Sequence, residues 1–248
     1  MIAVVMHIGA ASASPGVDAG GGRRPDGPPA GVLALIALGL TTAAVVMPLA
    51  MSRSVFPSPA VPADEVATYL TGNGRAVTLA GFFTFGASVP VGIYSATIYA
   101  RLVRLGVRVP GPNIAFFGGI SASVMLATAG LLTWSLAGSA VGVPSAVLRL
   151  LVDLVFALGG IGFVGGLGLL MAGVAVPALI LRLVPRWLAW VGLGLAVASE
   201  VSFLGLLWSG FDLLLPLGRF AGLLWLAAVG FVLPRTRHDV STRPERRR

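Results

Sequence analysis

The 248-residue sequence contains no cysteine and no lysine, and only two histidines. The absence of cysteine excludes disulfides, thiolate metal sites and cysteine nucleophiles. The absence of lysine excludes a retinal Schiff base and a P-loop of the G-x-x-x-x-G-K-[ST] type. His7 and His238 lie in the two tails, which excludes a bis-histidine haem within a span, an H-E-x-x-H zinc protease and a Ser–His intramembrane protease. We therefore expect no metal, no cofactor and no enzymatic activity.

Charged residues are also scarce. They make up 10% of the chain, whereas 56% of it is hydrophobic and the mean hydropathy is +0.94. A soluble globular domain is about one quarter charged, so lipid must solvate most of this chain. The net charge of +8 falls in short loops and a tail, where it sets membrane orientation rather than binding nucleic acid. The sequence predicts a multi-pass protein of the cell (inner, cytoplasmic) membrane.

Six apolar segments are long enough to cross a bilayer, which takes about 20 residues. They lie at residues 31–52, 76–99, 113–137, 146–181, 187–209 and 212–233. We therefore predict an all-α fold, a polytopic transmembrane helix bundle of six spans. A disordered N-terminal tail (1–30), a basic cytoplasmic tail (234–248) and one sizeable outer loop (53–75) complete the expected organisation.

Arginine placement predicts that both termini are cytoplasmic. With the N-terminus inside, 13 of the 17 arginines fall in inner segments, two in outer loops and two within spans. The fourth segment, 146–181, is long for one span, but splitting it would place Arg182 and Arg186 outside and break this pattern. Its length leaves two alternatives, a strong tilt or a locally unwound centre at "GGIGFVGG".

The outer loop holds three prolines followed by "ADEVATYL". The prolines keep the first half extended, and the second half predicts a short helix that Gly72 ends. Val66, Tyr69 and Leu70 form its apolar face. Two alternatives follow: an amphipathic segment resting on the outer interface, which we favour, or a lid over an outward-facing cavity.

Four charged residues lie within the predicted spans: Arg149 and Asp153 in the fourth, Glu200 in the fifth and Arg219 in the sixth. A charge within the bilayer is costly unless it is paired or hydrated. At about 1.5 Å per residue, all four fall in the outer half of the membrane. We expect a neutral cluster in which Arg149 pairs with Asp153 at i, i+4 and Glu200 pairs with Arg219 across the "SGFD" turn. Structural ion pairing is favoured over a substrate or proton site.

Glycines of the fourth segment form a separate stripe. At about 100° per residue, Gly159, Gly162, Gly166 and Gly173 share one face. Gly162 and Gly166 make a G-x-x-x-G, which permits close contact between membrane helices. We predict that this stripe packs against another span.

Several stretches together carry a family resemblance. They are "FPSP" with the following "ADEVATYL", "VPVGIYSATIYARLVRLGVRVPGP", "DLVFALGG", "LVPRWLAWVGLGLAVASE" and "LLPLGRFAGLLWL". Over roughly residues 53–237, the chain resembles a family of multi-pass membrane proteins of high-GC bacteria, classed as a domain of unknown function. The resemblance implies no activity and no catalytic residue. It implies that Asp153, Glu200 and Arg219 lie in recognisable segments of that family.

The favoured function is a non-enzymatic integral membrane protein with a structural or partner-binding role. The alternative is a small-molecule or ion transporter, or a ligand-binding protein, that uses the charge cluster. An enzyme acting on lipid is the weakest of the three. The expected partners are the lipid bilayer and, at the basic C-terminal tail, anionic lipid. No nucleic acid is expected, and the sequence indicates no particular protein partner.

Overall fold

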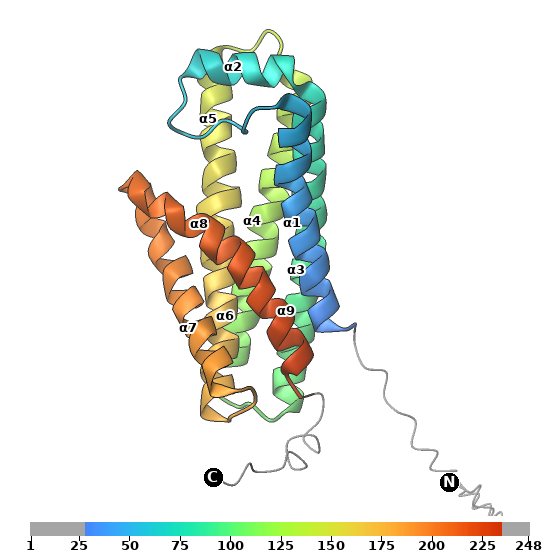
Figure 1. Ribbon diagram of the computed structural model, residues 1–248, viewed down its shortest axis with the longest axis vertical. Coiled ribbons are helices and arrows are strands. Elements are labelled where there is room, and N and C mark those ends of the chain that lie inside the picture. Colours follow the sequence, from blue (N-terminus) through green and yellow to red (C-terminus); the bar gives the residue numbers. More distant parts are fainter. Residues whose placement is uncertain (1–27, 235–248) are drawn as a thin grey trace, which may run out of the picture.

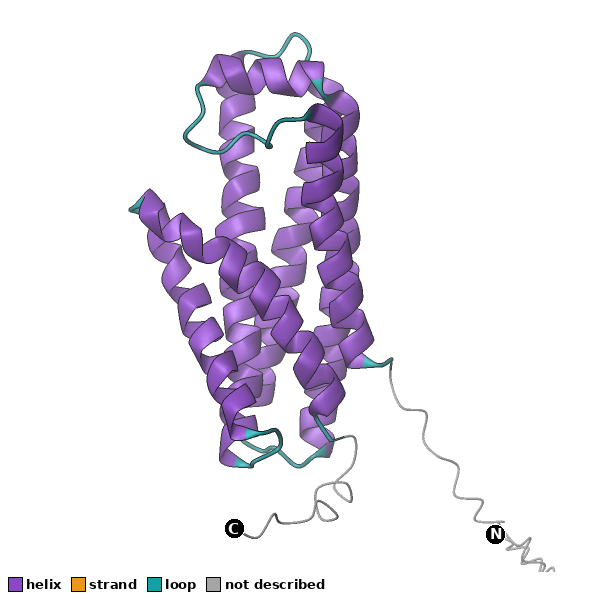
Figure 2. Ribbon diagram, viewed as in Figure 1, coloured by secondary structure: helices purple, strands orange, loops and turns teal. Residues whose placement is uncertain are grey.

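The computed structural model describes residues 28–234. All regular structure in this part of the chain is helical (Figure 2). Six of its helical segments are long and apolar enough to cross a membrane, which confirms the predicted helical bundle. The tails expected at 1–30 and 234–248 lie largely outside the described residues, as does the anionic-lipid binding expected of the basic tail, although Ala30 already begins the first helix.

The spans differ in how regular they are. Spans one to three are single helices, α1 (Ala30–Ser52), α3 (Gly74–Arg104) and α4 (Gly111–Ser139). Span four joins α5 (Ser145–Phe156), the π-helical turn η1 (Ala157–Gly162) and α6 (Phe163–Ile180). Span five joins α7 (Arg186–Val201) and the 3-10 helix η2 (Ser202–Leu206). Span six consists of the 3-10 helix η3 (Ser209–Leu213), α8 (Leu214–Pro216), the π-helical turn η4 (Leu217–Ala221) and α9 (Gly222–Val232).

Spans one to four stand side by side, and the short helix α2 (Ala63–Gly72) lies across one end of them (Figure 1). We call this the outer end. Both ends of the described chain lie at the opposite end. Spans five and six form a hairpin that leans on the bundle, and its turn lies nearer the middle than α2 does (Figure 1). The reason is length, because these spans have 21 and 24 residues whereas span four has 36.

Span four is one continuous helix with a widened turn, so it is neither split nor unwound. The backbone amide of Phe163 donates to the carbonyls of Leu158 and Gly160. In a regular α-helix this amide would instead donate to the carbonyl of Gly159, four residues earlier. A π-helical turn of this kind keeps the chain helical while it offsets the two halves, and such turns are frequent at functional sites.

Helix α2 turns its apolar face toward the protein. Val66, Tyr69 and Leu70 are buried in a cluster with residues of α4 and α5. The Tyr69 ring also meets Phe56 edge-on, with 5.8 Å between the ring centroids. The short helix forms at the predicted place, and its apolar face packs on the outer end of the bundle. The choice between a lid and a segment on the outer interface stays a prediction.

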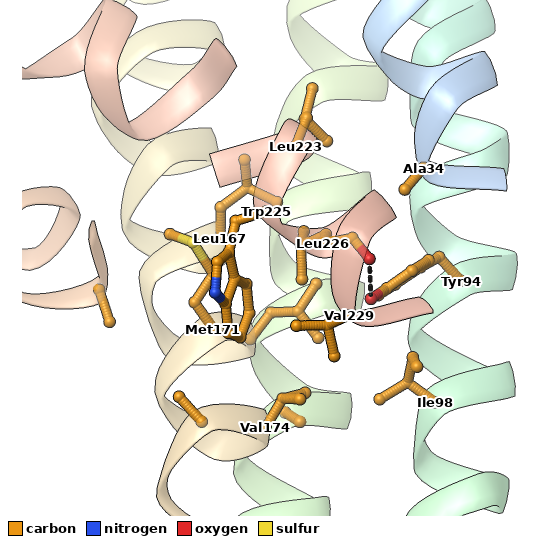
Figure 3. Packing of buried hydrophobic residues seen from close by; sticks show 14 of the residues in the cluster. Ala34, Tyr94, Ile98, Leu167, Met171, Val174, Leu223, Trp225, Leu226 and Val229 are labelled. Atoms are coloured by element: carbon orange, nitrogen blue, oxygen red, sulfur yellow. Dashed lines mark hydrogen bonds between the residues drawn. The ribbon is translucent and has the colours of Figure 1, made fainter. Parts of the chain in front are cut away.

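Polar side chains lock α9 into the inner core. The Tyr94 hydroxyl donates to the carbonyl of Leu226 at 2.8 Å (Figure 3), beside a packed group that includes Met171 and Trp225. Arg101, which is 5% exposed, donates to the carbonyl of Gly230 at 2.9 Å. The span expected at residues 76–99 ends before Arg101, whereas α3 continues to Arg104. The Gly230 carbonyl lies in the last turn of α9, where no later helical amide reaches it, so a side-chain donor is favourable.

Candidate functional site

A cavity of about 460 Å³ lies in the outer half of the bundle. Its walls come from α1, α3, α4, span four and span six, and three residues of the outer loop, Val55, Phe56 and Pro57, also line it. Most of the lining is apolar. The polar side chains that reach it are Thr84, Thr133, Asp212 and Arg219. The cavity therefore combines an apolar enclosure with a few polar groups.

Arg219 lies at the deep end of the cavity, on the π-helical turn of span six. Its guanidinium donates a hydrogen bond to the carbonyl of Gly159, on the π-helical turn of span four. The guanidinium carbon lies 5.3 Å from the centroid of the Phe163 ring, a cation–π contact. Within residues 28–234, no carboxylate lies within salt-bridge distance of Arg219. The cation is thus held by a carbonyl and a ring, neither of which carries charge.

The remaining polar groups are arranged around the apolar walls. The Thr133 hydroxyl is buried and donates to the carbonyl of Ala129 at 2.8 Å. One carboxylate oxygen of Asp212, Oδ1, is buried and has no hydrogen-bond partner in the described part of the chain. This oxygen lies against η2 at the end of span five, because a Cβ added to Gly205 would lie 2.5 Å from it. Asp212 therefore places its charge nearer the hairpin tip than Arg219 does.

The predicted pair of Arg149 and Asp153 forms, with 2.9 Å between Nε and Oδ1. Arg149 also donates to the carbonyls of Pro59 and Val61 in the outer loop. This pair is remote from the deep end of the cavity and attaches the loop to span four. It therefore holds the outer loop at Pro59 and Val61. The residues just before these, Val55 to Pro57, line the cavity.

The predicted pair of Glu200 and Arg219 does not form. Their backbones lie at similar depth, since a Cβ added to Gly218 would be 2.6 Å from the Ser199 hydroxyl. However, Glu200 Oε1 lies against Gly168, where an added Cβ would be 2.7 Å away. Arg219 instead reaches Gly159, nine residues earlier and about 13 Å along the same helix. The side chains point in opposite directions along span four, so the four intramembrane charges occupy three separate places and not one neutral cluster.

The glycine stripe of span four faces α4 along its whole length. Two of the glycines touch backbone, because an added Cβ would lie 2.7 Å from Ala122 N at Gly166 and 2.4 Å from Ala115 N at Gly173. The other two face side chains, Ala129 at 3.0 Å from Gly159 and Met125 at 3.3 Å from Gly162. These small residues bring span four close enough to α4 for the two helices to share one cavity wall.

Sequence reasoning did not single out Thr84, Thr133 or Asp212 as site residues. Asp212 carried a usable signal, because it is the acid of the turn "SGFD" before span six. The threonines carried none, since a hydroxyl in an apolar helix ordinarily bonds to the carbonyl four residues earlier. Only the arrangement of the spans shows that these residues line one cavity.

No family model, curated protein or solved structure matches this chain. The family resemblance therefore stays a prediction, and the chemistry of the site rests on its geometry. Within residues 28–234, no group of three or more His, Cys, Asp or Glu could hold a metal ion. The geometry offers one guanidinium, one carboxylate and two hydroxyls in an apolar enclosure, a set suited to binding and orienting a small molecule.

Proposed function

We propose that this integral membrane protein binds a small amphipathic molecule in its outer cavity, as a ligand-binding protein or transporter. The cavity is the observation that carries the proposal. Its volume of about 460 Å³ falls within the range of about 300–1,000 Å³ that is usual for small-molecule sites. Apolar walls with a few converging polar groups are also characteristic of such sites.

The rim of the cavity supports entry from the membrane. Val45, Leu49 and Val55 line the cavity and are also 46%, 42% and 75% exposed. Val45 and Leu49 belong to α1, a span whose exposed apolar side chains face lipid. A molecule dissolved in the bilayer would reach the cavity beside α1 without passing the outer loop.

The positions of the arginines support an orientation of the protein in the membrane. Arg108 and Arg182 lie in connections at the end opposite α2, and Arg186 begins α7 there, on the side where both ends of the described chain lie. Positive loops favour the cytoplasmic side. We propose that α2 faces outward from the cytoplasmic membrane and that the cavity belongs to its outer leaflet.

The structural role that the sequence favoured is supported for one pair of charges. Arg149 and Asp153 hold the outer loop by an ion pair and by bonds to Pro59 and Val61. Glu200 and Arg219 have no such arrangement, so structural ion pairing does not account for all four charges. The cavity therefore favours the ligand-binding alternative for the protein as a whole.

A neutral probe tests this proposal without reference to charge. The full-length protein in detergent would be labelled with a long-chain alcohol that carries a photoreactive diazirine, and the labelled peptides would be mapped by mass spectrometry. We expect labelling in the cavity segments of α1, α3 and span four. Thr84→Phe should abolish it by filling the cavity, whereas Thr128→Phe, the same change on an exposed face of α4, should not. Labelling spread evenly over lipid-facing residues in all three proteins would contradict the proposal.

A further inference from the structure

We infer that the ligand of the outer cavity carries a single anionic group, carboxylate or phosphate, on an apolar body, and that Arg219 binds that group. The inference rests on the proposed function and specifies the ligand class. It starts from a feature of the cavity that apolar binding does not require, a guanidinium at its deep end.

Arg219 is held in place and still has donors to offer. A guanidinium has five N–H donors in one plane, and the hydrogen bond to Gly159 comes from one nitrogen, Nη2. The guanidinium carbon lies over the face of the Phe163 ring, 5.3 Å from the ring centroid. The arrangement fixes the orientation of the guanidinium and leaves other donors for a second acceptor on the cavity side.

The charge of Arg219 calls for such an acceptor. An arginine within a membrane span is costly unless it is paired or reached by water, and a buried cation without a counter-ion loses much of its solvation. The Gly159 carbonyl and the Phe163 ring supply partial charges only. Since no carboxylate of residues 28–234 pairs with Arg219, an anionic ligand would supply the missing counter-charge, in the planar geometry that a guanidinium prefers.

Asp212 sets the direction of the bound molecule. It precedes Arg219 by seven residues, about 10 Å along span six, and points its buried oxygen toward Gly205. Negative charge near the hairpin tip and positive charge at the deep end favour a ligand whose anionic group lies deep. The apolar body would then contact walls that include Pro48, Leu49 and Phe156. Asp212 also disfavours a second anionic group near the rim.

The test compares an acid with the alcohol of the same chain length. Dodecanoate and dodecanol would compete with the photoreactive alcohol for the full-length protein in neutral detergent. We expect dodecanoate to bind at least about tenfold more tightly than dodecanol, since hydrogen bonds between a guanidinium and a carboxylate are stronger than those to a neutral hydroxyl. Arg219→Gln should abolish this preference, so that dodecanoate binds no more tightly than dodecanol. Arg75→Gln, which removes an exposed arginine outside the cavity, should preserve it.

A second variant keeps Arg219 intact, so it remains informative if Arg219→Gln does not fold. Asp212→Asn removes the negative charge near the rim and should tighten dodecanoate binding severalfold. Equal affinity for acid and alcohol in the unmodified protein, or weaker dodecanoate binding in Asp212→Asn, would overturn the inference while leaving the proposed function standing. Binding of neither probe would instead overturn the proposed function.

The anion could come from a free amphiphile or from a membrane lipid. Native mass spectrometry of the protein in phosphatidylglycerol and in phosphatidylcholine distinguishes them. Phosphatidylglycerol that dodecanoate displaces identifies an anionic lipid as the source, and dodecanoate binding that phosphatidylglycerol does not affect identifies a free amphiphile. Displacement of dodecanoate by phosphatidylcholine as readily as by phosphatidylglycerol would contradict an anion-selective site.

Discussion

The guanidinium of Arg219 donates a hydrogen bond to the carbonyl of Gly159, and this contact joins the two π-helical turns of residues 28–234. Such turns account for well under 1% of residues in globular proteins, yet here one lies in each of two neighbouring spans. In span four the turn releases the Gly159 carbonyl from the amide of Phe163. The same residue that closes the deep end of the cavity therefore connects the two irregular helices around it.

The close contact between span four and α4 predicts a graded series of glycine variants. Gly166→Ala and Gly173→Ala should each lower stability by about 1–3 kcal/mol, because the new methyl would meet backbone atoms that cannot move aside. Gly165→Ala is the matched control, since nothing lies within 4 Å of its added Cβ. Unfolding of the purified variants in a denaturing detergent would measure the difference. If Gly165→Ala lowered the stability as much as Gly166→Ala, the glycine stripe would not be the surface that packs against α4.

The link between Arg149 and the outer loop predicts a local effect. Arg149→Gln should lower stability by about 1 kcal/mol, the scale of partly exposed hydrogen bonds, and should speed hydrogen exchange in residues 53–62. Asp153→Asn should act in the same direction but less, because the carbonyl contacts of Arg149 remain. Hydrogen exchange measured by mass spectrometry checks both variants. Unchanged exchange in the loop of Arg149→Gln would show that the loop is held by other contacts.

The separate positions of Glu200 and Arg219 reverse an expectation from the sequence. A direct ion pair would make the double variant less destabilised than the sum of the single ones. With the side chains directed to Gly168 and Gly159, Glu200→Gln and Arg219→Gln should instead be additive within about 0.5 kcal/mol. A double-mutant cycle of unfolding free energies tests this. A coupling of several times that size would restore the predicted pair.

The topology predicts the outcome of reporter fusions. Fusions after residues 110, 184 and 237 should report the cytoplasm, and fusions near 62 and 142 the outside, since the arginine-rich connections favour the cytoplasmic side. The continuous helix from Ser145 to Ile180 makes the fusion at 184 the most informative one. If that fusion reports the outside, span four does not cross the membrane as a single helix.

The sequence by itself determined the number of the spans and their approximate positions. In lipid, the backbone N–H and C=O groups of apolar runs such as 31–52 and 187–209 must bond to each other, and a helix forms these bonds within the run itself. Composition and length are therefore sufficient to locate the spans. The i, i+4 pair of Arg149 and Asp153 and the glycine stripe of span four are also local, because helical periodicity alone decides which residues share a face. Those features could be predicted before any span was placed beside another.

Only the tertiary structure decided where the charges go and where the cavity forms. Similar depth placed Glu200 and Arg219 opposite one another, but depth does not say which way a long side chain extends along its neighbour. That direction depends on the π-helical turns and on the carbonyl that Gly159 offers to Arg219. The cavity has the same origin, because its lining gathers Pro48, Thr133 and Asp212 from distant parts of the chain. The packing of short spans against long ones brings these residues together, and no local sequence pattern encodes that packing.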